Sequence, residues 1–144
     1  SYASSHLQEK KAAERMFNAF KDNFDMKYTH EIKYVEAASD SCFIHATASY
    51  DNTRLGHTAL CNDDEDPSTA GLRCAKTLKE EISSNAVVDR FAADQLMIYI
   101  ALAGKGSFTT SEIRKHVPTN ASVIEQFLPV KFTIENNRIS CQKL

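Results

Sequence analysis

One segment restricts the possible folds more than any other part of the sequence. Residues 86–103 predict a helix that is apolar on almost every side, so other elements must cover most of its surface. Beyond this helix, the second half of the chain predicts only one more helix and about three short strands. These elements are too few to cover it. We therefore expect a further segment, outside these 144 residues, to complete this part of the fold.

The first half of the chain predicts helices packed on one side of a sheet. Residues 7–24 carry an apolar stripe at helical spacing, and residues 68–82 predict a second helix, capped by Asp66 or Ser68. Between the helices, polar and apolar side chains alternate as they do in half-buried strands. The expected strands are residues 26–35, 42–50 and 54–61. Because each strand has one strongly apolar face, we expect a two-layer unit.

The second half predicts shorter elements. Gly104 ends the apolar helix, as glycine commonly does at helix C-termini. Thr119 is expected to cap the next helix, and Asn136 and Asn137 are expected to form the turn of a closing hairpin. The elements after Gly104 are a strand at 107–109, a helix at 120–128, and strands at 131–134 and 138–141.

The expected fold class is α+β, in two unequal parts. Composition changes at residues 83–85, which we take as the boundary. Residues 1–85 would form a small two-layer α/β domain. Residues 86–144 would form an incomplete α/β unit that belongs to a larger domain.

Composition argues against several classes of protein. A hydrophobic fraction of 42% is enough to build a core, so the chain is not expected to be disordered. The net charge of −2 gives no overall basic field, and any contact with nucleic acid must come from a local patch. No apolar run approaches the roughly 20 residues that span a bilayer, so we expect no membrane partner. The four cysteines are widely spaced and form no CxxC pair, which argues against a zinc site and favours a reducing compartment.

Among five histidines, His116 is the candidate for chemistry. It is expected in a loop, three residues before the cap Thr119. The free amides and the positive end of the following helix would favour an anion held there, and the same field would keep the imidazole neutral and nucleophilic. On this position alone, a structural histidine is the better interpretation. The other four have structural interpretations, and no pair has the spacing of a metal site: His6, His30, His45 and His57.

A second candidate is the polar pair Asp94 and Gln95, which interrupts the apolar helix. A carboxylate in such a place is unfavourable unless it is paired or used. The alternative, that Asp94 faces solvent or caps a neighbouring loop, is equally supported. The acidic run at residues 63–66 is interpreted as a solvated loop, because its spacing matches no calcium loop.

Four blocks of sequence resemble RNA 3'-terminal phosphate cyclases in order and spacing. They are NAVVDRFAADQL at 85–96, ALAGKGSF at 101–108, HVPTN at 116–120 and VIEQFLPVKF at 123–132. The resemblance is strong over residues 83–133 and looser before them. The basic, glycine-containing turn of the family is not preserved, since LGHTAL at 55–60 and an acidic loop replace it.

The resemblance implies a fold as well as a function. The large domain of the family contains three repeated α/β units, with a small α/β domain inserted into the third. This chain would cover the insert, residues 1–85, and the end of the third unit, residues 86–144. The earlier units would then be the missing N-terminal segment.

The resemblance also implies which residues act. His116 would be the nucleophile that ATP adenylylates, with a divalent metal, Mg or Mn, assisting. The nucleotide would be lined by residues 91–95, namely Phe91, Ala92, Ala93, Asp94 and Gln95. AMP would pass to an RNA 3'-phosphate, which then cyclises, in the cytoplasm or in a eukaryotic nucleus. Without the N-terminal segment, this chain is expected to be inactive.

The alternative is a noncatalytic cyclase-like protein that serves as a binding module in ribosome assembly. Such relatives resemble the same blocks but lack the histidine, so the presence of His116 favours the enzyme.

Overall fold

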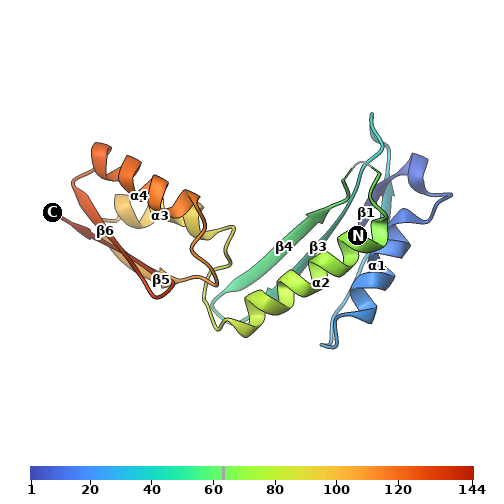
Figure 1. Ribbon diagram of the computed structural model, residues 1–144, viewed down its shortest axis with the longest axis horizontal. Coiled ribbons are helices and arrows are strands. Elements are labelled where there is room, and N and C mark those ends of the chain that lie inside the picture. Colours follow the sequence, from blue (N-terminus) through green and yellow to red (C-terminus); the bar gives the residue numbers. More distant parts are fainter. Residues whose placement is uncertain (63) are drawn as a thin grey trace. The chain divides into compact units, whose positions relative to one another are not determined.

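The computed structural model describes residues 1–62 and 64–144, and it divides them into two compact units. The first unit comprises Ser1–Ala48 and Gly56–Lys79, and the second comprises Ser49–Leu55 and Glu80–Leu144. Each unit has its own sheet with helices beside it, so the α+β class is confirmed (Figure 1). Asp63, part of the predicted acidic run, lies outside the described residues. None of the described helices is both long and apolar enough to cross a membrane.

The first unit contains a four-stranded sheet in the order β2-β1-β3-β4. The strands are β1 (Tyr2–Ser4), β2 (Lys33–Val35), β3 (Cys42–Ser49) and β4 (Arg54–Leu60). The helices are a 3-10 turn η1 (Ser5–Leu7), α1 (Ala12–Asp22) and α2 (Pro67–Ser83). β1 pairs parallel with β2 and antiparallel with β3. As predicted, Asp66 caps α2, since its carboxylate accepts a hydrogen bond from the Ser68 amide at 2.8 Å.

One face of this sheet is buried and the other is open. Along β3 the buried side chains of Cys42 and Ile44 alternate with the more exposed Phe43 and His45. The buried face meets apolar side chains of α1 and α2, the largest fully buried ones being Met16 and Leu78. The prediction that helices cover one side of the sheet is therefore confirmed.

Two boundaries predicted for the first unit are wrong. The helix expected at 7–24 begins at Ala12, because Lys11 has a left-handed backbone, with φ of 50°, that interrupts it. The strand expected at 26–35 is reduced to β2. Its alternating aromatic residues pack against α1 instead, and the ring of His30 stacks on that of Phe17 at 4.1 Å. His30 thus lies outside any strand.

The second unit packs two helices on a three-stranded antiparallel sheet in the order β5-β7-β6. Its elements are α3 (Ala93–Leu102), β5 (Lys105–Thr109), α4 (His116–Phe127), β6 (Val130–Glu135) and β7 (Arg138–Lys143). Asn136 and Asn137 form the predicted hairpin turn, with positive φ of 49° and 60°. The core has Met97 of α3, Val117 of α4 and Ile139 of β7 at its centre, each with 0% exposure.

Both helices of the second unit begin at unexpected residues. α3 begins at Ala93, not at residue 86, because the preceding residues form a bridge to Thr110 and a capped turn. α4 begins at His116, and Thr119 does not cap it. The Thr119 hydroxyl instead donates to the Lys115 carbonyl within the helix, at 3.2 Å. His116 is therefore the first helical residue, not a loop residue.

Only part of the apolar surface of α3 and α4 is covered within the second unit. Tyr99 and Leu102 of α3 are 65% and 67% exposed, and Phe127 of α4 is 81% exposed. This agrees with the view that α3 requires more cover than its own unit supplies. That a further segment provides the cover stays a prediction.

Gly71→Ala should destabilise the first unit, because residue 71 of α2 lies against the backbone of α1. A Cβ at this position would lie 2.0 Å from the Met16 carbonyl oxygen, so the helices would have to separate. We expect the free energy of unfolding to fall by about 1–3 kcal/mol, as at other overpacked sites. Urea unfolding followed by circular dichroism measures it. Gly56→Ala is the matched control, since its nearest contacts would be at 3.6 Å. Equal stability of both variants would contradict the close packing of α1 and α2.

Candidate functional site at the starts of α3 and α4

The candidate residues lie in two segments of the second unit, one leading into α3 and the other into α4. The Asn120 side-chain amide in α4 donates to the Asp94 carbonyl in α3 at 3.3 Å. The second turn of α4 is therefore in contact with the first turn of α3. This contact brings the helix that carries His116 to the helix that carries Asp94.

Asp89 shapes the segment before α3. Its carboxylate accepts hydrogen bonds from the amides of Phe91, at 3.0 Å, and Ala92, at 2.9 Å. Its carbonyl accepts a bond from the Ala93 amide at 3.1 Å. Asp89 is thus the cap of the turn that leads into α3, a role that the sequence interpretation missed. The available signal was an aspartate four residues before the first residue of an apolar helix.

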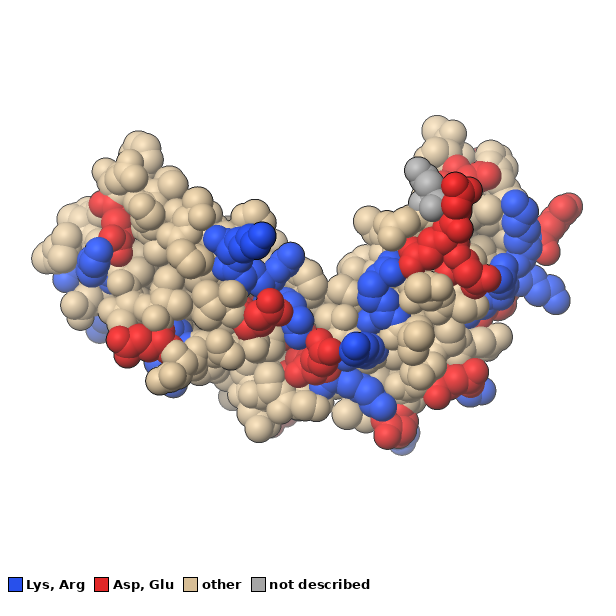
Figure 2. All heavy atoms as spheres, viewed as in Figure 1, with Lys and Arg blue, Asp and Glu red and all other residues tan. Residues whose placement is uncertain are grey.

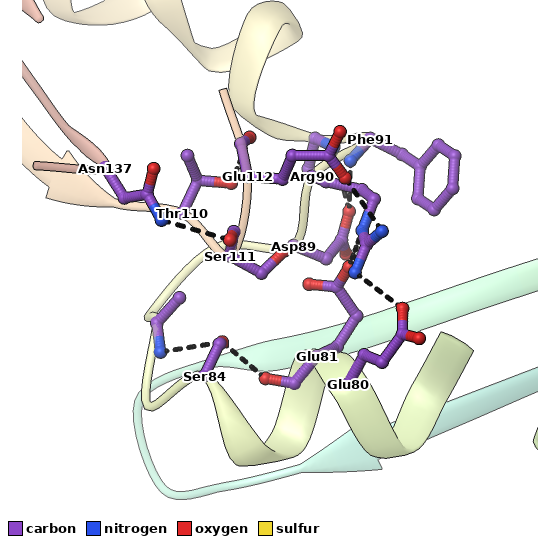
Figure 3. Close-up of polar contacts among 12 residues, drawn as sticks. Glu80, Glu81, Ser84, Asp89, Arg90, Phe91, Thr110, Ser111, Glu112 and Asn137 are labelled. Carbon is purple, nitrogen blue, oxygen red and sulfur yellow. Dashed lines mark hydrogen bonds and ion pairs between the residues drawn. The ribbon is translucent and has the colours of Figure 1, made fainter. Parts of the chain in front are cut away.

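Arg90 follows the cap and is surrounded by three carboxylates (Figure 3). Its guanidinium binds Glu81 through Nε, Glu112 at 2.8 Å and Glu80 at 3.2 Å. Glu81 is fully buried. Burial opposes the charge of Arg90, but the hydrogen bond and charge of Glu81, together with Glu112 and Glu80, raise the pKa of Arg90 above its ordinary value. Arg90 therefore remains a cation.

The segment before α4 is fixed at both ends. Asn137 of the β6–β7 turn donates to the Ser111 carbonyl at 3.1 Å and accepts from the Thr110 amide at 2.9 Å. Further along, the Arg114 guanidinium lies 4.8 Å from the centre of the Phe91 ring, a cation–π contact. The Phe91 ring points away from the carboxylate cluster (Figure 3). One of its faces is therefore occupied by Arg114.

His116 is exposed at the first position of α4. Arg114 and Lys115 directly precede it, and Lys and Arg atoms gather near the start of α4 on the face drawn in Figure 2. The helix adds the partial positive charge of its N-terminus. The surroundings of His116 are thus locally basic although the whole chain is slightly acidic, and they suit a phosphate group.

The five predicted nucleotide-lining residues differ in their exposure. Phe91, Ala92 and Asp94 are half-buried, and Gln95 is exposed and donates to the Phe91 carbonyl at 3.2 Å. Ala93 is fully buried in the core, so its side chain supports the segment from beneath.

Several other reactive residues belong to the first unit. Within the described residues, no three or more His, Cys, Asp and Glu side chains are grouped to hold a metal ion. Burial raises the pKa of Cys74 to about 12, so it is a packing residue. His45 lies on β3 and His57 on its neighbour β4 in the first unit, and His6 pairs with Asp40 at 3.0 Å.

Comparison with known proteins places this chain in a family. Residues 5–134 match the profile of the family described as RTC: RNA 3'-terminal phosphate cyclase. A protein named RNA 3'-terminal phosphate cyclase from Nitrosospira multiformis is 37% identical over 100 residues, which are 69% of this chain and 28% of that protein. Proteins of the same name from Methanosarcina acetivorans and Thermococcus sibiricus are 46% and 32% identical over 56% and 90% of this chain.

The α+β chain matches this profile over most of its length. The chain belongs to the RNA 3'-terminal phosphate cyclase family. It spans 22–37% of the length of the three relatives named above.

Replacing Asp89 with alanine should loosen the segment before α3. Two amides lose their acceptor, so the free energy of unfolding should fall by about 1 kcal/mol. Hydrogen exchange at the amides of Phe91 and Ala92 should become faster, as measured by NMR or mass spectrometry. Asp89→Asn is the control, since its amide oxygen can still accept these bonds. If alanine and asparagine variants exchange alike, Asp89 is not the cap.

Proposed function

We propose that this chain is part of an ATP-dependent enzyme that converts an RNA 3'-phosphate into a 2',3'-cyclic phosphate through a histidine–AMP intermediate. The observation that carries the proposal is the position of His116. It is exposed at the first turn of α4, next to two basic residues, and the following turn of α4 contacts the first turn of α3. Membership of the cyclase family and the names of the relatives support the same activity.

In the first step, an imidazole nitrogen of His116 attacks the α-phosphorus of ATP. A nitrogen–phosphorus bond forms, the bond from the α-phosphorus to the bridging oxygen breaks, and pyrophosphate leaves. Negative charge grows on the phosphate oxygens as this happens. In this proposal, the amides at the start of α4, with Arg114 and Lys115, would offset that charge. A covalent intermediate divides one difficult reaction into easier steps.

In the second step, an oxygen of the RNA 3'-phosphate attacks the phosphorus of the histidine–AMP. The nitrogen–phosphorus bond breaks, His116 is restored, and a phosphoanhydride joins AMP to the RNA. In the third step, the neighbouring 2'-hydroxyl attacks the 3'-phosphorus and loses its proton. AMP leaves, and the 2',3'-cyclic phosphate remains.

The segment of residues 91–95 is the proposed binding site for the nucleotide. Phe91 supplies an aromatic ring, which suits stacking with a purine base. Asp94 and Gln95 supply polar groups beside it, and Ala92 and Ala93 keep the segment compact. A divalent ion, Mg or Mn, would accompany ATP.

The rest of the enzyme, in this proposal, is an N-terminal segment that packs on the exposed apolar surface of α3 and α4. Tyr99, Leu102 and Phe127 are the largest exposed apolar side chains there. The share of the relatives that this chain covers, 22–37%, leaves room for such a segment. The expected location is the cytoplasm, or the nucleus of a eukaryote.

The second candidate is a noncatalytic cyclase-like binding module of ribosome assembly. Its members resemble the same blocks but lack the histidine. An exposed His116 at a helix start favours the enzyme over this candidate.

The 144-residue chain by itself should not cyclise RNA, because the remaining ATP contacts are proposed to lie in the N-terminal segment. The test incubates the purified chain with ATP, Mg or Mn and a 3'-phosphorylated oligonucleotide. Protection of the terminal phosphate from phosphatase reports cyclisation. Robust protection would show that the N-terminal segment is not required.

His116→Asn in the full-length protein should abolish transfer of label from α-labelled ATP to the protein. Asparagine keeps approximate size and polarity but cannot form the intermediate, and an exposed position contributes little to stability. Asp94→Ala should weaken labelling without removing it. His45→Asn is the control, since His45 is exposed in the first unit. Labelling of the His116→Asn protein, or label mapped to a lysine, would favour the noncatalytic candidate.

A further inference from the structure

We propose that Arg90 is the positioning residue of the nucleotide site, holding the segment of residues 91–95 in a fixed place relative to the start of α4, where His116 lies. This inference rests on the proposed function, since it assigns a task within the same site. Arg90 does not itself touch the reacting atoms. It acts through Phe91, the next residue, and through the loop that contains Glu112.

The three carboxylates around Arg90 come from two separate elements. Glu80 and Glu81 belong to the last turns of α2, and Glu112 belongs to the loop between β5 and α4. One guanidinium therefore joins the end of α2 to the segment before α3 and to the loop before α4 (Figure 3). Glu112 lies only four residues before His116. The segment of residues 91–95 and the loop that leads to His116 are thus connected through the side chain of Arg90.

Stability alone does not account for this cluster. One carboxylate would neutralise Arg90, yet three are present, which leaves an excess of negative charge. Glu81 is fully buried, and its Oε2 has no hydrogen-bond partner among the described residues. Desolvation of such a pair is unfavourable, and apolar replacements of similar volume are often as stable or more so. An apolar pair cannot hold its partners in defined orientations. The planar guanidinium fixes several partners at defined angles.

The backbone bridge of Val88 to Thr110 also joins the two segments, but it lies before the Asp89 turn and does not include residues 91–95. Two further contacts involve residues 91–95 themselves, and both are weaker. One is the cation–π contact of Arg114 with Phe91, which contributes about 0.5–1 kcal/mol at exposed sites. The other is the hydrogen bond from Asn120 to the Asp94 carbonyl, which is long at 3.3 Å. Without Arg90, these contacts would keep the segments near each other but not in one geometry. Displacement of a reacting group by about 1 Å can slow a reaction about 100-fold.

The test compares variants of the full-length enzyme by the rate of label transfer from α-labelled ATP to His116, measured over a range of ATP concentrations. Arg90→Met removes the charge, and Arg90→Lys keeps it but replaces the fork by a single nitrogen. We expect both to lower the second-order rate about 10- to 100-fold, with a higher half-saturating ATP concentration and a lower maximal rate. Lys131→Met is the control, because it removes an exposed ion pair with Glu125 elsewhere in the second unit.

A second variant separates positioning from folding. Glu81→Leu combined with Arg90→Met replaces the buried pair by apolar side chains, which should preserve stability. If positioning is the task, this double variant folds as well as the wild type but labels as slowly as Arg90→Met. If its label transfer returns to the wild-type rate, or if the loss in the single variants follows only the unfolded fraction, the inference is overturned.

Hydrogen exchange in the same proteins distinguishes this inference from the proposed function. Amides of residues 91–95 should exchange faster in the Arg90 variants, while those of β7 in the core should not change. If the wild type is never labelled, the proposed function fails, and exchange alone then decides whether Arg90 positions the segment. Unchanged exchange at residues 91–95 would overturn the positioning role, whatever the labelling shows.

Discussion

The arrangement of the second unit depends on the carboxylate of Asp89. Because it binds the amides of Phe91 and Ala92, the chain turns before entering α3 instead of continuing a helix from residue 86. A side-chain acceptor of this kind competes directly with helical backbone bonds. The turn leaves Arg90 and Phe91 outside the regular helix. Both side chains can therefore reach partners that a helix would not present to them.

Two sets of contacts follow from that turn. Arg90 reaches back to Glu81 at the end of α2 and across to Glu112, while Phe91 meets the guanidinium of Arg114. The sheet below contributes the other anchor, because the β6–β7 turn holds the loop before α4 through Asn137. A basic, exposed helix start is in this way held beside a short aromatic and acidic segment. The rigidity arises from a few polar contacts at the edge of a small apolar core.

The sequence was sufficient where one simple pattern governs the structure. Alternation located β3 and β4, and the asparagine pair located the β6–β7 turn. The sequence was not sufficient where contacts with one particular partner determine the structure. The alternation at residues 26–35 places aromatic rings under α1 instead of extending β2, and β1 is three residues long, too short to show a period.

The same distinction, between simple sequence patterns and particular partners, applies to the candidate site. A histidine near a helix start could be recognised from the sequence, although the start itself was misplaced because Thr119 bonds within α4 and not at its end. The partners of Arg90 could not be found, since Glu81 and Glu112 lie 9 and 22 residues away along the chain. No periodicity connects them. Only the folded chain brings these side chains together.

α2 has one further consequence, for the lengths of chain that this fold tolerates. Glu80 and Glu81 are neighbours in the last turns of α2, and both bind Arg90. One residue inserted between them would turn Glu80 by about 100° more around the helix axis relative to Glu81 and shift it by about 1.5 Å. Arg90 could then no longer bind both carboxylates. The end of α2 is therefore expected to keep its number of residues.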